Sequence, residues 1–520
     1  MSKKFYITTA IPYVSGVPHV GNVYEMILAD SIARYKRLEG YDVLFQTGTD
    51  EHGLKIETAA KDKGVPTKEY VDEITAKIIK MYEELDIVYD KFVRTTDEMH
   101  MKTVQRIFAR LYEQGDIFLG KYAGWYSVSE EAYIFDKDAI EQGVGPAGDK
   151  LIWMEEETYF LDLKKYQKRL VNHIEKNPDF ILPISRKNEM INNFLKEPLP
   201  DLSVTRTTLE WGIPVLDGKH KVYVWIDALS NYITGFDLDE NFTSREMERY
   251  WPADVHVIGK DILRFHTIYW PTILMCLGIE LPKTIFGHPW ILVNKDKMSK
   301  STGNVLYTTD ILKYFKKDTL RYYVLHEIPY QADGNLTYEL LIEKHNSDLA
   351  NTLGNLVNRT LGMIKKYQGG VVKKEFTKGE YGLSLKEDAA GLLKRVTLKM
   401  NEYRVGDALD EVMKTLRNAN KFIDLTEPWN LNKKEETKTE LAGVLYEIIE
   451  TIRICAVILQ AFIPESAREI LKQINTDLDT FVSIEEFGGY PNNNNIGEAK
   501  VLFERYNVDE KMEEILREQK

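Results

Sequence analysis

The chain has 520 residues, of which 43% are hydrophobic and 29% charged, and its formal net charge is -13. This length predicts several domains, and the composition is that of a soluble globular protein. The acidic balance argues against a protein that coats nucleic acid generally, because phosphate binding would then depend on local basic patches.

The sequence shows no pattern typical of secretion or membrane insertion. The apolar run near residues 452–462 is interrupted by Arg453 and Gln460, which excludes a membrane span there. The N-terminal run contains two threonines and Pro12, and no cleavage pattern follows. Cys276 and Cys455 lie in apolar surroundings, so we expect core residues in a reducing compartment rather than a disulfide. We therefore expect a cytoplasmic chain with no membrane partner.

The first 50 residues predict a strand, loop, helix and strand. Residues 5–9 are apolar and β-rich, residues 12–18 form a Pro/Gly loop, residues 21–38 suit a helix, and residues 42–46 suit a second strand. His19 falls in the loop just before the helix, where free N–H groups and the helix dipole favour phosphate. The alternative is an ordinary surface histidine.

Asp50 follows the second strand in the run TGTDEHG. A carboxylate at the carboxyl end of a parallel strand suits an ammonium ligand, because ligands of such sheets bind at that edge. The alternative is that Asp50 caps the helix that follows.

The pattern changes from about residue 116. Residues 122–163 are rich in tyrosine, tryptophan, glycine and acids, and they predict short strands and turns inserted between two halves of a nucleotide fold. The insertion has no cysteine, so a tetrahedral thiolate zinc site cannot form there. We expect no zinc, and we interpret the isolated acids as surface charge.

The second half of the sheet is predicted after this insertion. Strands are expected at residues 221–226, 254–259 and 284–287, and a helix opens at residues 260–266. Both halves together predict an α/β fold with a doubly wound, Rossmann-like parallel sheet.

The run KMSKS, residues 297–301, lies in a loop after an apolar strand at residues 290–293. Lys297 and Lys300 can bring two ammonium groups onto a polyphosphate, and Gly303 allows the loop to move. Each charge at close range is worth roughly 4 kcal/mol at an effective dielectric constant of about 20. A lysine pair alone is more often a solvated turn.

Two segments resemble the signatures of class I aminoacyl-tRNA synthetases. KMSKS is the second signature, and PHVGN at residues 18–22 resembles the first, His-x-Gly-His, with asparagine in the last place. Asn22 still donates a hydrogen bond but cannot carry charge. The resemblance implies ATP as cofactor with Mg²⁺ on its phosphates. It implies catalytic roles for His19, Asn22, Lys297 and Lys300, and ATP binding by His19, Gly21, Asn22, Lys297, Met298, Ser299, Lys300 and Ser301.

Local motifs narrow the resemblance to the methionyl-tRNA synthetases. Their methionine pocket would be formed here by Ile11, Tyr13, Trp225, Ile262, Phe265, His266 and Trp270, and Asp50 would face the amino group. A thioether makes favourable contacts with aromatic rings, and a phenol or imidazole can offer it a weak hydrogen bond. The alternative for each tryptophan is an ordinary core position. Leu229 and Asn231 receive no chemical role.

The chain from residue 346 onward predicts a helix bundle that reaches about residue 470. Apolar side chains recur at helical spacing, as in Leu349, Leu353, Leu356, Thr360 and Ile364. In the family that this chain resembles, a polar pair corresponding to Asn355 and Arg359 contacts the anticodon, and a tryptophan corresponding to Trp429 stacks on a base. Solvated surface is the alternative for the polar pair. Stacking is worth about 1–3 kcal/mol per base.

The resemblance also implies a division into domains. We expect a catalytic fold in two parts, residues 1–115 and 217–290, around a connective insertion at residues 116–216. The lysine loop and a stem-contact segment would occupy residues 291–345, the helical anticodon-binding domain residues 346–485, and an extended segment with a docking helix residues 486–520. The chain stops there without the additional dimerising barrel that some relatives carry, so we expect a monomer.

The implied activity is ligation of methionine to tRNA. ATP would activate L-methionine to methionyl-adenylate and pyrophosphate, and methionine would pass to the 3'-terminal adenosine of tRNA(Met). Positioning and charge stabilisation by His19, Lys297 and Lys300 would supply the rate. Two alternatives remain: a class I synthetase of the leucine or cysteine type, and a catalytically idle tRNA-binding relative. The interpretation requires that His19 and the two lysines meet at one site.

Overall fold

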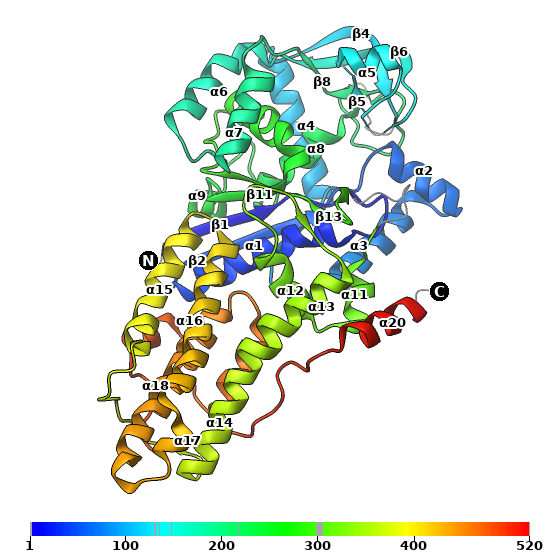
Figure 1. Cartoon of the computed structure of the whole chain (residues 1–520). Coiled ribbons are helices and arrows are strands. Elements are labelled where there is room, and N and C mark those ends of the chain that lie inside the picture. The colour runs from blue at the N-terminus through cyan, green and yellow to red at the C-terminus, as the bar shows by residue number, and fades with distance from the viewer. Residues whose placement is uncertain are drawn as a thin grey trace.

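The computed structural model describes residues 3–128, 132–134, 136–146, 148–216, 218–297 and 305–518. Its centre is a six-stranded parallel sheet in the order β3-β2-β1-β11-β12-β7 (Figure 1). These strands are β1 (Lys4–Thr9), β2 (Asp42–Thr49), β3 (Lys91–Arg94), β7 (Ile181–Leu182), β11 (Val255–Gly259) and β12 (Ile285–His288). Strand order steps outward from β1 in both directions, which confirms the predicted doubly wound α/β fold.

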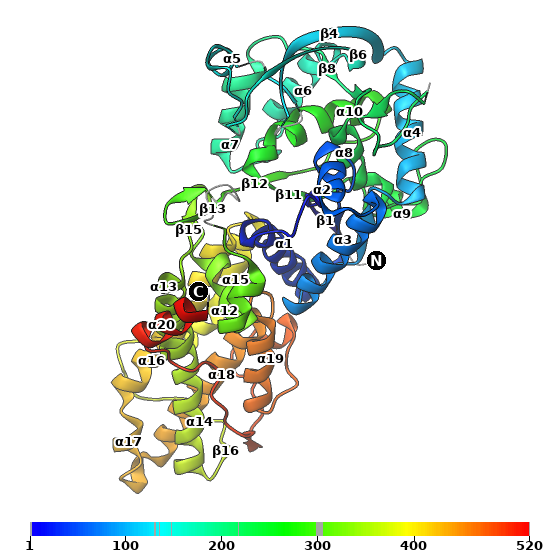
Figure 2. The same ribbon diagram turned by 90° about the vertical axis from the view of Figure 1, so that its right-hand side faces the viewer.

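Helices cover both faces of this sheet (Figures 1 and 2). On one face lie α1 (Val20–Leu38) and α3 (Thr67–Glu84); on the other lie α4 (Glu98–Glu113), α8 (Val224–Thr234) and α10 (Trp270–Leu277). Along β1, Phe5 and Ile7 belong to the core on the α1 face, whereas Tyr6 belongs to the core on the α8 face. This alternation follows from the two-residue repeat of a strand that is buried on both sides. Two further helices, α2 (Leu54–Lys63) and α9 (Arg245–Tyr250), lie beside the sheet.

The insertion is built on an antiparallel sheet in the order β5-β4-β6-β8. Its elements are β4 (Ile117–Ser127), β5 (Ala132–Tyr133), α5 (Lys137–Gln142), β6 (Ile152–Leu161), α6 (Lys164–Lys176), α7 (Ile184–Met190), β8 (Leu202–Ser203) and β9 (Thr205–Arg206). Strands β4 and β6, of 11 and 10 residues, are longer than the short strands expected from the sequence. They pair along almost their whole length, from Ile117 opposite Leu161 to Tyr126 opposite Ile152.

The strand expected at residues 221–226 is wrong in its second half. Only β10 (Lys221–Val222) is extended, and α8 begins two residues later, so Trp225 is helical. The run KVYVWI is rich in β-formers, but Ile226, Leu229 and Ile233 recur at helical spacing and are all buried. Packing of that face on the sheet therefore outweighs local β-propensity.

A small sheet, a short helical segment and a long bundle complete the chain. The small sheet contains β13 (Ile291–Val293), β14 (Asp296–Lys297) and β15 (Gly334–Asn335), and the helices α11 (Thr308–Tyr314), α12 (Lys317–His326) and α13 (Tyr338–Lys344) lie next to it. The bundle contains α14 (Asn355–Gln368), α15 (Leu385–Asn401), α16 (Val405–Thr426), α17 (Pro428–Leu431), α18 (Lys438–Leu459) and α19 (Pro464–Gln473). A minor ladder joins β16 (Val371–Val372) to β17 (Asn494–Asn495).

The predicted stripe of α14 and the segment before it is buried at every position: Leu349, Leu353, Leu356, Thr360 and Ile364. The last segment returns along the bundle to the middle of the molecule (Figures 1 and 2). There Leu502 and Phe503 are buried, and α20 (Val508–Glu518) packs on α13. Within the described parts of the chain, no helix is both long and apolar enough to cross a membrane.

Candidate active site

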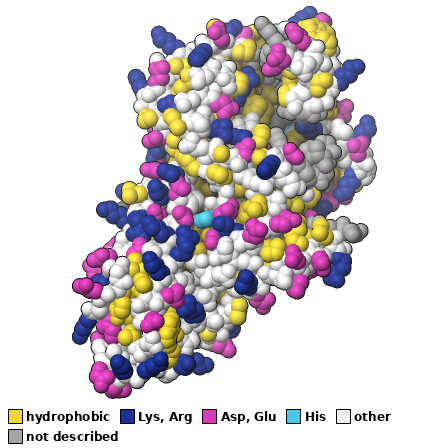
Figure 3. Space-filling model, viewed as in Figure 1, with side chains coloured by type: hydrophobic (Ala, Val, Ile, Leu, Met, Phe, Trp, Pro, Cys, Tyr) yellow, Lys and Arg dark blue, Asp and Glu magenta, His cyan; other side chains and the backbone are white. Residues whose placement is uncertain are grey.

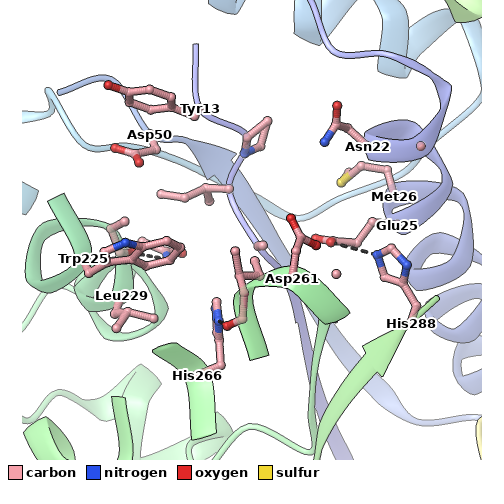
Figure 4. A pocket seen from close by; sticks show the side chains of 18 of the residues that line it. Tyr13, Asn22, Glu25, Met26, Asp50, Trp225, Leu229, Asp261, His266 and His288 are labelled. Carbon is pink, nitrogen blue, oxygen red and sulfur yellow. Dashed lines mark hydrogen bonds and ion pairs between the residues drawn. The ribbon is translucent and has the colours of Figure 1, made fainter. Parts of the chain in front are cut away.

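A cavity of about 430 Å³ opens at the carboxyl ends of β1, β2 and β11 (Figure 4). This is the edge at which parallel α/β sheets bind ligands. Hydrophobic side chains gather in a hollow between the upper and middle parts of the molecule (Figure 3). The cavity is lined by Ala10, Ile11, Pro12, Tyr13, His19, Gly21, Asn22, Glu25, Met26, Asp50, Lys55, Tyr82, Tyr223, Trp225, Ala228, Leu229, Asn231, Tyr232, Gly259, Asp261, Ile262, His266, His288, Trp290 and Ile291.

His19 and Asn22 form the N-terminal cap of α1. The amide of Gly21 donates to Nδ1 of His19 at 3.1 Å, and the amide of His19 donates to Oδ1 of Asn22 at 3.3 Å. Because Nδ1 of His19 is an acceptor here, Nε2 carries the ring proton. Because the oxygen of Asn22 is used by the cap, its NH₂ group is the part suited to donate to a ligand. Both side chains line the cavity beside the helix N-terminus, where an anion is stabilised.

Asp50 lies at the opposite wall, held by the backbone. Its amide donates to the carbonyl of Pro12 at 3.0 Å, and its carbonyl accepts from Val14 at 3.0 Å, so β1 and β2 present Tyr13 and Asp50 side by side. The Asp50 residue is 6% exposed. A carboxylate in this position is suited to an ammonium group.

The residues after Asp50 are fixed by side-chain hydrogen bonds to buried carboxylates, which the sequence analysis missed. Glu51 is fully buried and accepts from Nε of Arg94 at 2.7 Å. His52 and His100 each contact one oxygen of Asp227 at 2.7 Å. Burial alone would raise the pKa of Asp227, but the two imidazoles lower it below its ordinary value. These contacts hold the loop of Asp50 against α4 and α8. In the sequence, only the run TGTDEHG indicated that this loop carries polar side chains with a structural role.

An aromatic wall closes another side of the cavity. Trp225 lines it and stacks on Phe265 with ring centroids 3.6 Å apart and planes at 6°. The predicted residues Ile11, Tyr13, Ile262 and His266 also line the cavity, whereas Phe265 and Trp270 do not. Phe265 supports Trp225 from behind. Trp270 is fully buried and donates from Nε1 to Nε2 of His256 at 3.3 Å.

His266 is neutral in this wall. Its Nδ1 donates to the carbonyl of Ile262 at 2.9 Å, and its Nε2 accepts from the hydroxyl of Tyr232 at 2.7 Å. Burial lowers the pKa of His266 to about 4. The wall therefore offers a soft, uncharged, aromatic environment, which suits a thioether better than a charged group.

Glu25 and His288 form an acidic corner that the sequence analysis also missed. Their side chains meet at 3.1 Å, and Nδ1 of His288 donates to the carbonyl of Pro289 at 2.8 Å. Burial raises the pKa of Glu25, and contact with His288 lowers it in part. The spacing of His19, Asn22, Glu25 and Met26 on one face of α1 was the signal available in the sequence.

The lysine loop is attached close to this cavity at both ends. Before it, Trp290 and Ile291 line the cavity, and Leu292 pairs with Lys297 in the β13–β14 hairpin. After it, the carbonyl of Leu306 accepts from the amide of Val20 at 3.0 Å, in the first turn of α1. Of the predicted loop residues, the backbone of Lys297 is described, and the following lie outside the described residues: Met298, Ser299, Lys300 and Ser301.

The predicted anticodon residues lie far along the bundle from the cavity. Helices α14 and α17 lie side by side at its lower end (Figures 1 and 2). Asn355 is exposed on α14, and Nη2 of Arg359 lies 3.3 Å from Oδ1 of Asp424. Trp429, on α17, is 39% exposed. An exposed aromatic side chain is what a stacked base requires.

No cluster of three or more His, Cys, Asp or Glu side chains suited to a metal ion occurs among the described residues. The expectation of an insertion without zinc stays a prediction.

Family models match almost the whole chain. The model described as "tRNA synthetases class I (M)" matches residues 5–147 and 140–361, and the model "Anticodon binding domain of methionyl tRNA ligase" matches residues 372–515. The chain thus belongs to the class I aminoacyl-tRNA synthetases, as its fold and its two signature segments indicate.

Individual relatives narrow this class further. A methionine–tRNA ligase of Clostridium tetani is 48% identical over 99% of this chain and 80% of its own length, and one of Halalkalibacterium halodurans is 45% identical over the same shares. A solved structure of Mycobacterium tuberculosis methionyl-tRNA synthetase with methionyl-adenylate is 39% identical, covers 97% of this chain and 100% of its own, and superposes with a TM-score of 0.92. Within its class, the chain is a member of the methionine–tRNA ligase family.

Proposed function

We propose that the cavity activates L-methionine with ATP and that the chain then transfers methionine to tRNA(Met). The observation that carries the proposal is the meeting of three features at one cavity of about 430 Å³. The N-terminus of α1, with His19 and Asn22, faces the cavity, and Asp50 and the aromatic wall line it. The β13–β14 hairpin, which contains Lys297, borders the cavity. The neutral His266 in the wall favours an uncharged amino-acid side chain.

Methionine binds between Asp50 and the aromatic wall in this proposal. Asp50 accepts the ammonium group, while Tyr13, Trp225 and Ile262 surround the side chain, with Ile11 at its edge. His266 and Tyr232, which are hydrogen-bonded to each other, form an uncharged polar edge of the wall near the proposed position of the sulfur. Phe265 and Trp270 act from behind this wall, by fixing the ring planes of its members.

ATP binds along the N-terminus of α1. His19, through Nε2–H, and Asn22, through its NH₂ group, donate to phosphate oxygens, and Gly21 leaves room for the nucleotide. Lys297 and Lys300, with Met298, Ser299 and Ser301, approach from the hairpin side. Mg²⁺ arrives with ATP, held by phosphate oxygens and water, so it needs no dedicated protein cage.

The reaction needs no nucleophilic side chain. The methionine carboxylate attacks the α-phosphorus, the bond to the β-phosphate oxygen breaks, and pyrophosphate leaves. His19 and the two lysines stabilise charge that grows on the phosphates, and the rate comes from placing the reactants in contact. The terminal adenosine hydroxyl of tRNA then attacks the carbonyl of the adenylate and releases AMP.

The bundle selects the tRNA in this proposal. Asn355 and Arg359 contact anticodon bases, and Trp429 stacks on one of them. We also propose the domain division stated above, a monomeric state and a cytoplasmic location. Light scattering, metal analysis of the purified chain and fractionation of cells test the monomer, the zinc-free insertion and the location.

Exchange of pyrophosphate into ATP across a panel of amino acids tests the activity. We expect exchange with methionine alone. Exchange with leucine or cysteine instead would replace the substrate assignment, and tRNA binding without any exchange would favour the idle relative.

A further inference from the structure

The lysine hairpin, defined as β13, β14 and the turn between them, is short over the residues that the structure describes. Among the described residues, two residue pairs join its strands, Leu292 with Lys297 and Val293 with Asp296. The turn residues Asn294 and Lys295 have φ values of 53° and 70°, which is the left-handed pair of a two-residue hairpin turn. An isolated hairpin of two strands is marginal in water. Something outside it must therefore hold it at the cavity.

The segment 333–335 supplies this support through its backbone and through Asn335. Strand β15 lies parallel to β13, with the amide of Gly334 donating to the carbonyl of Trp290 at 3.0 Å. Oδ1 of Asn335 accepts from the amide of Lys295 at 3.0 Å, in the turn itself. A Cβ at Gly334 would lie 2.5 Å from Cδ1 and 3.1 Å from Cα of Ile328, so the segment approaches its neighbours closely there.

Asp333 holds the start of the hairpin. Its Oδ1 accepts from the amide of Trp290 at 3.0 Å, and both its oxygens lie 2.7 Å from Nζ of Lys260. The same ammonium lies 4.0 Å from the ring centroid of Trp290. Charge-assisted bonds of this kind are shorter and stronger than neutral ones. One carboxylate thereby fixes both the backbone and the ring of Trp290.

Lys260 connects this arrangement to the floor of the cavity. It follows directly on Gly259, the last residue of β11, and precedes Asp261. Nε1 of Trp290 donates to Oδ1 of Asp261 at 3.2 Å, and both these side chains line the cavity. The ion pair of Asp333 with Lys260 therefore joins Trp290, at the start of the lysine hairpin, to the carboxyl end of β11 beside the cavity.

We infer that Asp333 is a positioning residue for adenylate formation. It acts through Lys260 and Trp290 to hold the lysine hairpin at the cavity, so that the ammonium groups beyond it meet the phosphates. The inference rests on the proposed function for the role of that hairpin. Asp333 itself does not line the cavity and is not expected to contact methionine.

Two substitutions of Asp333 test its contribution to adenylate formation in steps. Asp333→Ala removes both the ion pair and the acceptor for Trp290, whereas Asp333→Asn keeps an acceptor and removes the charge. We expect the single-turnover rate of adenylate formation to fall by about 100-fold in Asp333→Ala, because a misplacement of about 1 Å has effects of that size. The fall in Asp333→Asn should be smaller. The Kd of methionine should stay within about twofold in both, since no contact in its pocket changes.

Asp42→Ala is the matched control. Asp42 has a side chain 26% exposed, against 25% for Asp333, and it pairs with Arg249 at the amino end of β2, away from the cavity. This variant should keep both the rate and the methionine Kd of the unchanged chain. If Asp333→Ala fails to fold, Asp333→Asn and Asn335→Ala carry the comparison.

Amide hydrogen exchange supplies a readout that does not depend on activity. Exchange in a peptide covering residues 290–297 should be faster in the Asp333 variants and unchanged in Asp42→Ala. Equal losses of rate and methionine binding, or unchanged exchange at residues 290–297, would overturn the inference. Absence of pyrophosphate exchange in the unchanged chain would instead remove the proposed function, and the hydrogen-exchange comparison alone would then decide the placement of the hairpin.

Discussion

At the scale of single residues, His266 shows how contacts at both ring nitrogens select a charge state. Nδ1 donates to a backbone carbonyl, Nε2 accepts from Tyr232, and burial lowers its pKa to about 4. A histidine on an apolar wall could have been a charged ligand for a substrate. In this molecule it is a neutral part of the cavity wall.

The lowered pKa of His266 predicts a pH dependence of stability. Above its ordinary pKa of 6.5 this imidazole is neutral in both the folded and unfolded chain, and between 6.5 and about 4 only the unfolded chain binds the proton. Stability is therefore retained above pH 6.5 and lost as the pH falls, by at most about 1.4 kcal/mol per pH unit from this residue. Urea unfolding of the unchanged chain and of His266→Gln at pH 6.5 and 5.5 measures the difference. The same pH slope in both would contradict it.

Lys300→Ala tests the lysine signature at the same scale. We expect adenylate formation to slow by at least about 100-fold, in line with the loss of one group that stabilises charge in the transition state. The methionine Kd should remain within about twofold, because the aromatic wall and Asp50 are untouched. Single-turnover pyrophosphate release and methionine binding give the two numbers. Equal losses in the rate of adenylate formation and in methionine affinity would show that Lys300 stabilises bound methionine in the ground state instead.

At the scale of elements, the sequence predicted most of what local patterns determine. The βαβ unit with His19 at its loop and the buried stripe of α14 both depend on short-range periodicity or on a motif of a few residues. Helix α8 was not predicted, because Trp225 and its neighbours are β-formers, and packing against the sheet places them in a helix. Glu25, His288 and the pairing of Asp227 with two histidines were missed for the same reason. Each contact joins residues more than 100 positions apart, and the local patterns that contain these residues do not show which partner each one contacts.

Helix α17 gives a prediction at this scale. Trp429→Ala should weaken binding of tRNA(Met) by about 1–3 kcal/mol, the value of one base stacked on an aromatic ring. Methionine-dependent exchange without tRNA should not change, because α17 lies at the far end of the bundle from the cavity. Phe376→Ala is a control of similar exposure, 37% against 39%, in the same part of the chain. Filter binding with tRNA measures both, and an equal effect of the control would contradict a specific stack.

At the scale of the whole molecule, one buried arginine joins the catalytic fold to the bundle. Arg321, on α12, is fully buried and lies 2.7 Å from Oδ2 of Asp30 on α1. Its guanidinium also donates to the carbonyl of Phe462 after α18 and to that of Leu85 after α3. Four segments from distant parts of the chain thus share one planar group, whose fixed donors suit such a junction.

Removing this group should destabilise the whole chain. We expect Arg321→Met to lower the free energy of unfolding by about 3–5 kcal/mol, because it leaves buried partners without their donor. Arg468→Ala provides the comparison, since that side chain is 58% exposed and pairs with Asp86 at the surface. Such a surface pair is worth at most about 1 kcal/mol. Urea denaturation followed by circular dichroism measures both, and similar midpoints for the two variants would refute the junction.

The hydrogen bond between the amide of Val20 and the carbonyl of Leu306 has a consequence for how this family can vary. Val20 in the first signature and Leu306, which follows the lysine loop, are nearly three hundred positions apart in the chain and are joined by peptide groups alone. Replacement of either side chain leaves that tether intact, and only proline at position 20 would abolish the donor. Changes of amino-acid identity at these two positions, other than to proline at position 20, therefore leave the hydrogen bond between the start of α1 and Leu306 available.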